Sequence, residues 1–229
     1  MPEWLRWTLV VILLAISACL IFNEQIKEHM VDSYRPTISR KTIAKNSSKK
    51  GNYDFSNVQD LSLQTVAKAR AKKQSINIIG EITAPDSHMT IPIAKGVDNN
   101  TLALAAGTLR ADMQMGKGNY ALAGHNMANH SKILFSPLYD HAKVGQKVYI
   151  TDLNKVYEYK LYERKIIQPT QVDVINDTKN PIITLITCND DGSERLMLRG
   201  KLVKSESFKK APKVVQKNFS QKYTTGRNS

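Results

Sequence analysis

The stretch Ile182-Ile183-Thr184-Leu185-Ile186-Thr187-Cys188 is followed at once by Asn189-Asp190-Asp191-Gly192. The first run, rich in β-branched side chains, predicts a β-strand, and the second predicts a turn. Because side chains alternate along a strand, Cys188 shares one face with Thr184 and Ile186. The thiol is therefore expected at the accessible end of a strand. The alternative is a small buried core side chain, a common role for free cysteine.

Short β-rich runs separated by turn residues continue on both sides of this strand. Together they predict a mainly β fold, a barrel or a sandwich, with few helices. The predicted strands are residues 76–82, 89–93, 120–124, 147–151, 156–167, 182–187 and 195–203. Helices are expected at residues 61–74, 99–106 and 133–141, and a turn at residues 169–175.

Two residues at predicted strand ends supply what a cysteine nucleophile needs. A thiol reacts as its thiolate, which a base or a nearby cation must favour at neutral pH. His125 follows the apolar run 120–124, and Ala123 shares its face. Arg195 opens the strand after the turn, so a hairpin returns its guanidinium toward Cys188, where it can stabilise an oxyanion. Taken singly, each has an ordinary alternative, a structural histidine or a solvated strand charge.

The N-terminal residues are apolar enough to cross a membrane. Residues 7–22 contain only mildly polar exceptions, and Trp4 and Trp7 suit the headgroup level. We expect residues 1–23 to form an uncleaved transmembrane signal anchor, because the basic region is weak and no small-x-small cleavage site follows. A cleavable signal peptide is the alternative. The flanking charges do not fix the orientation, but a large folded domain can be exported regardless of its charge.

The remaining residues are placed on the extracellular side of the cell membrane. There an unpaired thiol needs a reason, and Cys188 cannot pair with Cys19, which lies inside the apolar run. We expect a stalk and N-terminal helix at residues 24–74, with residues 46–52 least structured. The catalytic β-barrel is expected at residues 75–207, and a basic tail at residues 208–229 is expected to trail over the surface.

The net charge of +13 requires an anionic partner or surroundings. Lysines and arginines concentrate in residues 35–50, which contain no acid, and after residue 201. Such charge suits anionic lipid or an anionic cell wall. Aromatic residues that could stack on bases are not interleaved with these charges, so nucleic acid is not expected as a partner.

Taken together, these residues resemble the signature of the class A sortases of Gram-positive bacteria. That family carries a Thr-Leu-x-Thr-Cys strand, a following arginine and an upstream Ala-Gly-His. Here these are Thr184 to Cys188, Arg195 and Ala123-Gly124-His125. The segment 169–175 and the single N-terminal anchor also match, and the resemblance spans residues 75–205. It implies an eight-stranded sortase-type β-barrel and a two-step cysteine transpeptidase.

The resemblance also implies the partners and the residue roles. Such enzymes cleave a Leu-Pro-x-Thr-Gly-like sorting signal of secreted proteins between Thr and Gly through a thioester. They then join the protein to an amine of a lipid-linked peptidoglycan precursor. Cys188 would be the nucleophile, His125 the proton-transfer partner and Arg195 the electrostatic helper. The groove for leucine and proline would be lined by Ala123, Val172, Val174, Ile175, Thr184 and Ile186.

One departure from the family concerns calcium. Some class A sortases bind calcium through acids in the loop before the histidine strand and one acid later. Here that loop, residues 108–119, holds Arg110 and Lys117 and a single acid, Asp112, with Asp177 at the later position. Calcium takes about six to eight oxygen ligands. We therefore expect neither a calcium site nor another cofactor, with Arg110 or Lys117 pairing to Asp177.

Two other functions remain open at this point. A membrane-anchored cysteine peptidase would use the same nucleophile and base but let water take the acyl group. A non-catalytic, membrane-tethered wall-binding module would use the basic tail and leave Cys188 idle. An amine acceptor distinguishes the first alternative, and alkylation of Cys188 distinguishes the second.

Overall fold

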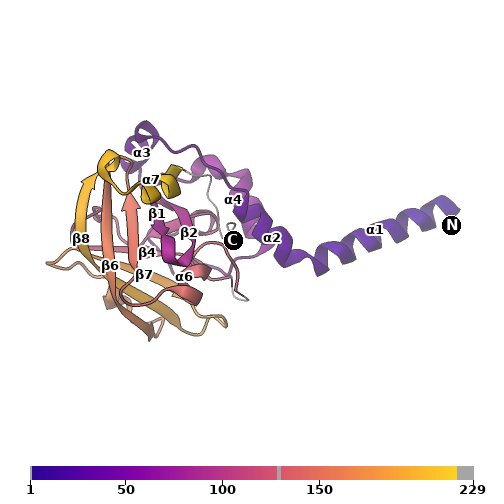
Figure 1. Ribbon diagram of the computed structural model, residues 1–229. Coiled ribbons are helices and arrows are strands. Elements are labelled where there is room, and N and C mark those ends of the chain that lie inside the picture. Colours follow the sequence, from indigo (N-terminus) through magenta and orange to yellow (C-terminus); the bar gives the residue numbers. More distant parts are fainter. Residues whose placement is uncertain (1, 128–129, 221–229) are drawn as a thin grey trace.

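The computed structural model describes residues 2–127 and 130–220 and centres on a closed β-barrel (Figure 1). The strands follow one another in the order β1-β2-β3-β4-β7-β8-β6-β5. This architecture confirms the predicted eight-stranded barrel. The strands are β1 (Ile78–Ala84), β2 (Met89–Ala94), β3 (Ala106–Thr108), β4 (Asn119–Ala123), β5 (Lys147–Thr151), β6 (Lys155–Ile167), β7 (Ile182–Cys188) and β8 (Arg195–Ser207).

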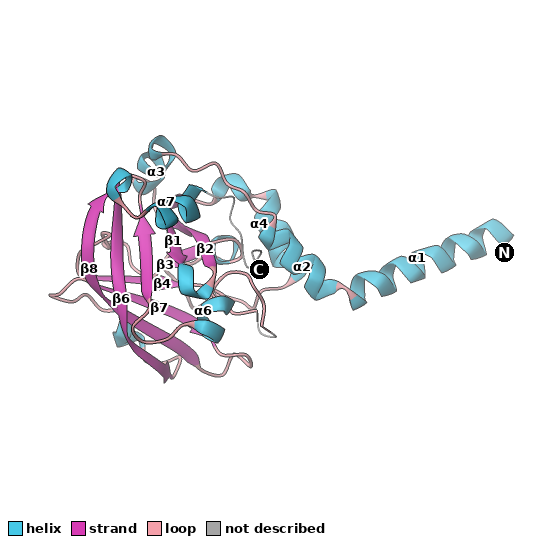
Figure 2. Cartoon of the chain, viewed as in Figure 1, coloured by secondary structure: helices cyan, strands magenta, loops and turns pink. Residues whose placement is uncertain are grey.

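Helices lie outside the barrel and on its ends (Figure 2). The α-helices are α1 (Glu3–Ile21), α2 (Asn23–Asp32), α3 (Arg40–Ser47), α4 (Leu63–Ala71), α5 (Asn99–Leu102), α6 (Ser136–His141) and α7 (Lys213–Ser220). The 3₁₀ turns are η1 (Lys73–Ser75), η2 (Pro85–Ser87), η3 (Val172–Ile175) and η4 (Phe208–Lys210).

The alternation of side chains along β4, β7 and β8 separates the core from the site. Ile183 and Leu185 of β7 belong to the main apolar core, as do Leu122 of β4 and Leu198 of β8. The neighbouring side chains on these strands point to the outer face of the barrel. Cys188, Ile186 and Thr184 therefore share one face, as the sequence predicted, and the structure shows that it is the outer face.

Differences from the predicted elements are small and local. The first strand begins at Ile78 rather than at residue 76, and the predicted helix 99–106 ends at Leu102. Its remainder includes β3, which pairs with β2 through Ile93–Ala106 and Ala94–Gly107. A strand of three residues is too short for a periodic pattern, which is why it was missed.

The structure corrects the predicted stalk. Residues 24–74 form a folded layer, because α3 packs on β1, α2 packs on α4, and α4 packs on α5. Val31, Tyr34 and Ile43 are buried, and the first two join a second apolar cluster that includes Val66. Residues 46–52, predicted to be least structured, begin inside α3. Apolar residues are sparse in this lysine-rich stretch, so its composition concealed a folded layer.

Helix α1 extends away from this folded body (Figure 1). In the part of the chain that the structure describes, it is the one helix long and apolar enough to cross a membrane. It has 19 residues and none of them is buried. At 1.5 Å per residue it spans about 28 Å, close to the thickness of a bilayer's hydrocarbon core.

The C-terminal segment is also more ordered than predicted. Instead of trailing over the surface, η4 and α7 pack on the barrel, where Val215 and Phe219 are buried beside Tyr149 and Val156. The apolar positions of α7 recur at helical spacing, a pattern hidden by the many lysines around them. The last part of the predicted tail, residues 221–229, lies outside the described residues.

Candidate active site

The β7–β8 hairpin brings Cys188 and Arg195 together. Cys188 is the last residue of β7 and pairs directly with Arg195, the first residue of β8, as the sequence predicted. Gly192 has φ +74° in the connecting turn, a conformation that glycine adopts without strain. The Arg195 guanidinium is steadied by this turn, because Nη1 donates to Gly192 O at 2.8 Å and to Glu194 O at 3.0 Å.

His125 reaches the same edge of the barrel from β4. The strands β4 and β7 are parallel, with Ala123 opposite Ile186, so His125 and Cys188 each lie two residues beyond a matched pair. The Gly124 N–H continues the ladder by donating to Ile186 O at 3.1 Å. A side chain at Gly124 would meet the Phe135 ring at 2.6 Å, which explains the glycine before the histidine.

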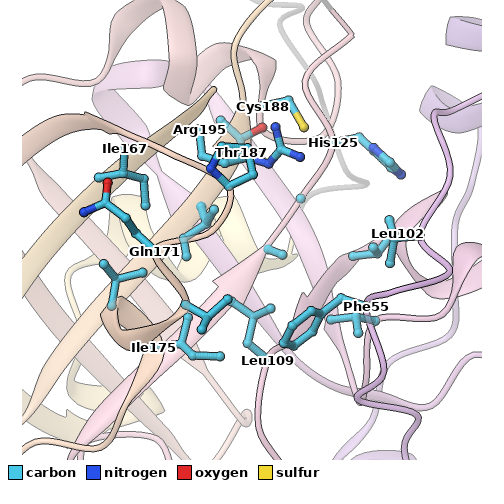
Figure 3. A pocket seen from close by; sticks show the side chains of 18 of the residues that line it. Phe55, Leu102, Leu109, His125, Ile167, Gln171, Ile175, Thr187, Cys188 and Arg195 are labelled. Carbon is cyan, nitrogen blue, oxygen red and sulfur yellow. The ribbon is translucent and has the colours of Figure 1, made fainter. Parts of the chain in front are cut away.

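The side chains of the three residues are not equally close. In Figure 3 the Arg195 guanidinium lies beside the sulfur of Cys188, whereas the His125 ring points away from it. The His125 Nε2 is buried and finds no hydrogen-bond partner among the described residues. The imidazole is therefore available, but a proton transfer with Cys188 requires the ring to turn.

Burial sets the resting protonation state of the pair. It lowers the pKa of His125 to about 4, and Lys27 and Arg195 act in the same direction while Asp60 opposes them. Burial also raises the pKa of the Cys188 thiol, an effect that Arg195 partly offsets and Asp60 reinforces. At neutral pH both shifts favour a neutral thiol and a neutral imidazole.

Beside these residues lies a cavity of about 360 Å³ on the outer face of the barrel (Figure 3). It is lined by Cys188, His125 and Arg195 and by apolar side chains from β4, β7 and η3. Of the predicted groove residues, the structure places five in its lining: Ala123, Val172, Val174, Ile175 and Ile186.

Thr184 corrects the prediction for the groove. It lies on the predicted face of β7 but is fully buried and does not line the cavity. Its hydroxyl donates to Asn119 Oδ1 at 2.8 Å, and Asn119 Nδ2 in turn donates to Val174 O and Asn176 O at 3.0 Å each. Strand alternation gave the right face but could not show that η3 covers this part of it.

Sequence reasoning missed the wall opposite the strands. Residues Phe55, Val58, Gln59 and Asp60 line the cavity, although they belong to the segment predicted as a stalk. This segment is fastened through Asn99, which accepts from the Gln59 N–H at 2.9 Å and donates to Asn57 O at 3.1 Å. The sequence of residues 55–60 has no periodic apolar pattern that would predict a wall of the cavity. The other missed lining residues are Val97, Leu102, Leu109, Gly124, Ile167, Gln168, Pro169, Gln171 and Thr187.

The loop before β4 is closed by an ion pair. Arg110 Nη2 lies 3.3 Å from Asp177 Oδ1, and Arg110 Nε lies 3.2 Å from Asp112 Oδ1. Arg110, rather than Lys117, is thus the cation that meets Asp177. Hydrogen bonds from the Asn119 and Thr178 N–H groups, together with this guanidinium, lower the pKa of Asp177.

The site thus combines an apolar cavity with a free thiol on the outside of a closed β-barrel. A family model described as the sortase domain matches residues 82–203. The chain is also 40% identical to sortase A of Streptococcus agalactiae, over 96% of this chain and 94% of that protein. Sortase A of Listeria monocytogenes is 38% identical, over 90% of this chain and 95% of the relative.

Solved structures agree with these relatives. The crystal structure of Listeria monocytogenes sortase A is 39% identical, with a TM-score of 0.57, and the match covers 62% of this chain and 96% of that one. The chain belongs to the sortase family and is an enzyme of the sortase A type.

Proposed function

We propose that this chain is a membrane-anchored transpeptidase that cleaves a Leu-Pro-x-Thr-Gly-like signal between Thr and Gly. It then joins the secreted protein to an amine of a lipid-linked cell-wall precursor, on the extracellular side of the membrane. The observation that carries the proposal is the strand register. It sets Cys188 opposite Arg195 and brings His125 to the same edge, beside an apolar cavity.

The first half-reaction forms the acyl-enzyme. Cys188 Sγ attacks the threonine carbonyl carbon, forming an S–C bond and an oxyanion that the Arg195 guanidinium stabilises. The C–N bond to glycine then breaks, and the leaving amine takes a proton from His125. Because the resting imidazole is neutral, that proton first comes from the thiol, after the His125 ring has turned toward it.

The second half-reaction restores the enzyme. The acceptor amine attacks the thioester carbonyl carbon and loses a proton to His125, and Cys188 leaves as a thiolate. His125 then returns this proton to the thiolate, which restores the neutral pair. The apolar lining from Ala123, Ile186 and η3 supports the leucine and proline of the signal. In this proposal the reaction needs no cofactor, no calcium and no nucleic-acid partner.

An acyl-enzyme experiment tests the proposal. The full chain in maltoside micelles is incubated with a sorting-signal peptide, and peptide mapping by mass spectrometry looks for a thioester on Cys188. A Cys19→Ala variant serves as the matched control and should still form the thioester. An added amine acceptor should then receive the acyl group.

The same experiment separates the alternatives. Exclusive release of hydrolysed peptide in the presence of the acceptor would identify a peptidase instead. Failure to form a thioester or to cleave any sorting-signal peptide would leave the non-catalytic wall-binding module as the better explanation.

A further inference from the structure

A second cavity, of about 500 Å³, lies in the folded N-terminal layer, away from the active site. It lies between the link after α2, the helix α3, the end of α4 and the start of β1. The two cavities share no lining residue within residues 2–127 and 130–220. Many of its lining residues come from the acid-free basic run 35–50, which the proposed reaction does not use.

The lining of this cavity is strongly cationic. Among the described residues, the lining contains no carboxylate and five basic side chains: Arg35, Lys45, Lys49, Arg70 and Lys73. Cations gathered around one cavity repel one another, and this repulsion is relieved when an anion enters.

Most of these cationic groups are not paired with a carboxylate, so they can bind an anionic ligand. The side-chain ammonium groups of Lys45 and Lys73 have no hydrogen-bond or ion-pair partner in the described part of the chain. Lys49 Nζ donates to a neutral partner, Asn77 Oδ1, at 3.0 Å. Arg70 stacks 5.8 Å from the centre of the Tyr34 ring, which holds its guanidinium in place without neutralising it. Arg35 is the exception, with Asp32 Oδ1 at 4.0 Å.

The chemistry and size of the cavity favour a phosphate group. Arginine forks and lysine ammonium groups are the side chains that bind phosphate oxygens. A cavity of this volume holds more than a single small ion, so a phosphoester or pyrophosphate fits it. Along the chain, Phe22 and helix α2, which is about 15 Å long, separate the end of α1 from the first lining residue, Ser33. A lipid headgroup and a soluble phosphate are therefore both possible sources.

We propose that the cavity lined by Lys45, Lys49, Arg70 and Lys73 is a binding site for a phosphate-bearing anion. It acts independently of the active site. Binding would fix α3 and α4 against the barrel, because the lining residues come from both helices and from β1. It should weaken as ionic strength rises, as expected for a partly exposed charged site.

Direct titration tests the site with two probes. The full chain in maltoside micelles is titrated calorimetrically with inorganic pyrophosphate. In a second series it is titrated with short-chain phosphatidylglycerol in the micelles, and with phosphatidylcholine as the zwitterionic control. The variant is Lys45→Ala/Lys73→Ala. Its matched control is Lys143→Ala/Lys179→Ala, which removes the same charge from exposed lysines elsewhere.

We expect saturable one-to-one binding by the unchanged chain and the control, and at least tenfold weaker binding by Lys45→Ala/Lys73→Ala. Pyrophosphate binding identifies a soluble phosphate as sufficient, and binding only with phosphatidylglycerol identifies a lipid headgroup. Equal weakening by both double variants would overturn the proposal, since net charge alone would then explain binding. So would equal binding of phosphatidylcholine, or failure of both anionic probes to saturate. Unchanged thermal midpoints would show that the variants remain folded.

Discussion

Residues 123–125, at the end of β4, and residues 55–60 both contribute to the lining of the cavity beside Cys188, but only the first stretch continues a paired strand. β4 pairs with β7 residue by residue, and the Gly124 N–H extends the ladder toward His125. The opposite wall depends on a few side-chain bonds, chiefly those of Asn99. A ladder positions reacting groups firmly, whereas a few local bonds leave a wall that can adjust to a substrate.

The largest expected effect on activity comes from replacing Cys188, on the side of the cavity that is formed by paired strands. Cys188→Ala should abolish both thioester formation and turnover, because no other side chain in the cavity replaces the sulfur. The barrel should stay folded, since removing a small side chain at a strand end leaves little cavity. Peptide cleavage and thermal unfolding measure the two outcomes. Residual turnover by this variant would contradict the whole mechanism.

Arg195 should have the next largest effect. Arg195→Ala is expected to lower kcat/KM on the order of a hundredfold, in line with the loss of one oxyanion donor. Arg195→Lys should also be poor, because an ammonium does not replace a guanidinium fork. Cleavage of a fluorogenic sorting-signal peptide measures both.

Arg199→Ala is the matched control for Arg195. Arg199 shares the strand face but binds Val174 O at 3.1 Å and lies 3.7 Å from Glu163, so its loss should be mild. A larger loss for Arg199→Ala than for Arg195→Ala would mean that the hairpin assigns the wrong arginine to the reaction.

Replacing Asp60 tests the position of residues 55–60, the side of the cavity that lacks strand pairing. Its carboxylate raises the pKa of both His125 and Cys188, so Asp60→Asn should lower both. Alkylation requires the thiolate. With Cys19→Ala in both chains, the alkylation rate of Cys188 should therefore rise at a lower pH in Asp60→Asn than in the chain that keeps Asp60. The shift should be small and should fade with salt, because Asp60 is exposed. Asp86→Asn is the control. An unchanged alkylation profile for Asp60→Asn would place residues 55–60 away from the thiol in solution.

The smallest effect concerns calcium. Arg110 contacts Asp177 where a divalent ion would need carboxylates, and a guanidinium repels such an ion. Cleavage rates in chelator and in millimolar calcium should therefore be equal. Severalfold activation by calcium would show that ions can displace this pair and that the loop was assigned wrongly.

The two walls also differ in how far the sequence could predict them. Cys188, Arg195 and His125 follow from strand alternation, a turn and a family pattern, all of which are local signals. Phe55 and Asp60 lie in a polar segment whose fold depends on distant partners such as Asn99. The orientation of the His125 ring and the burial that lowers its pKa are products of tertiary packing, so no local pattern could predict them.

The folded layer between α1 and the barrel limits how far the barrel can move from the end of α1. If residues 24–74 were a flexible linker, the root-mean-square distance between its ends would be on the order of 40 Å, and the barrel could move that far from α1. Here Phe22 alone joins α1 to α2, and α2 packs on α4. Bending at this single junction then becomes the main freedom of the tethered enzyme. If α1 spans the membrane, the folded layer holds the cavity beside Cys188 at a nearly fixed distance from the end of that helix.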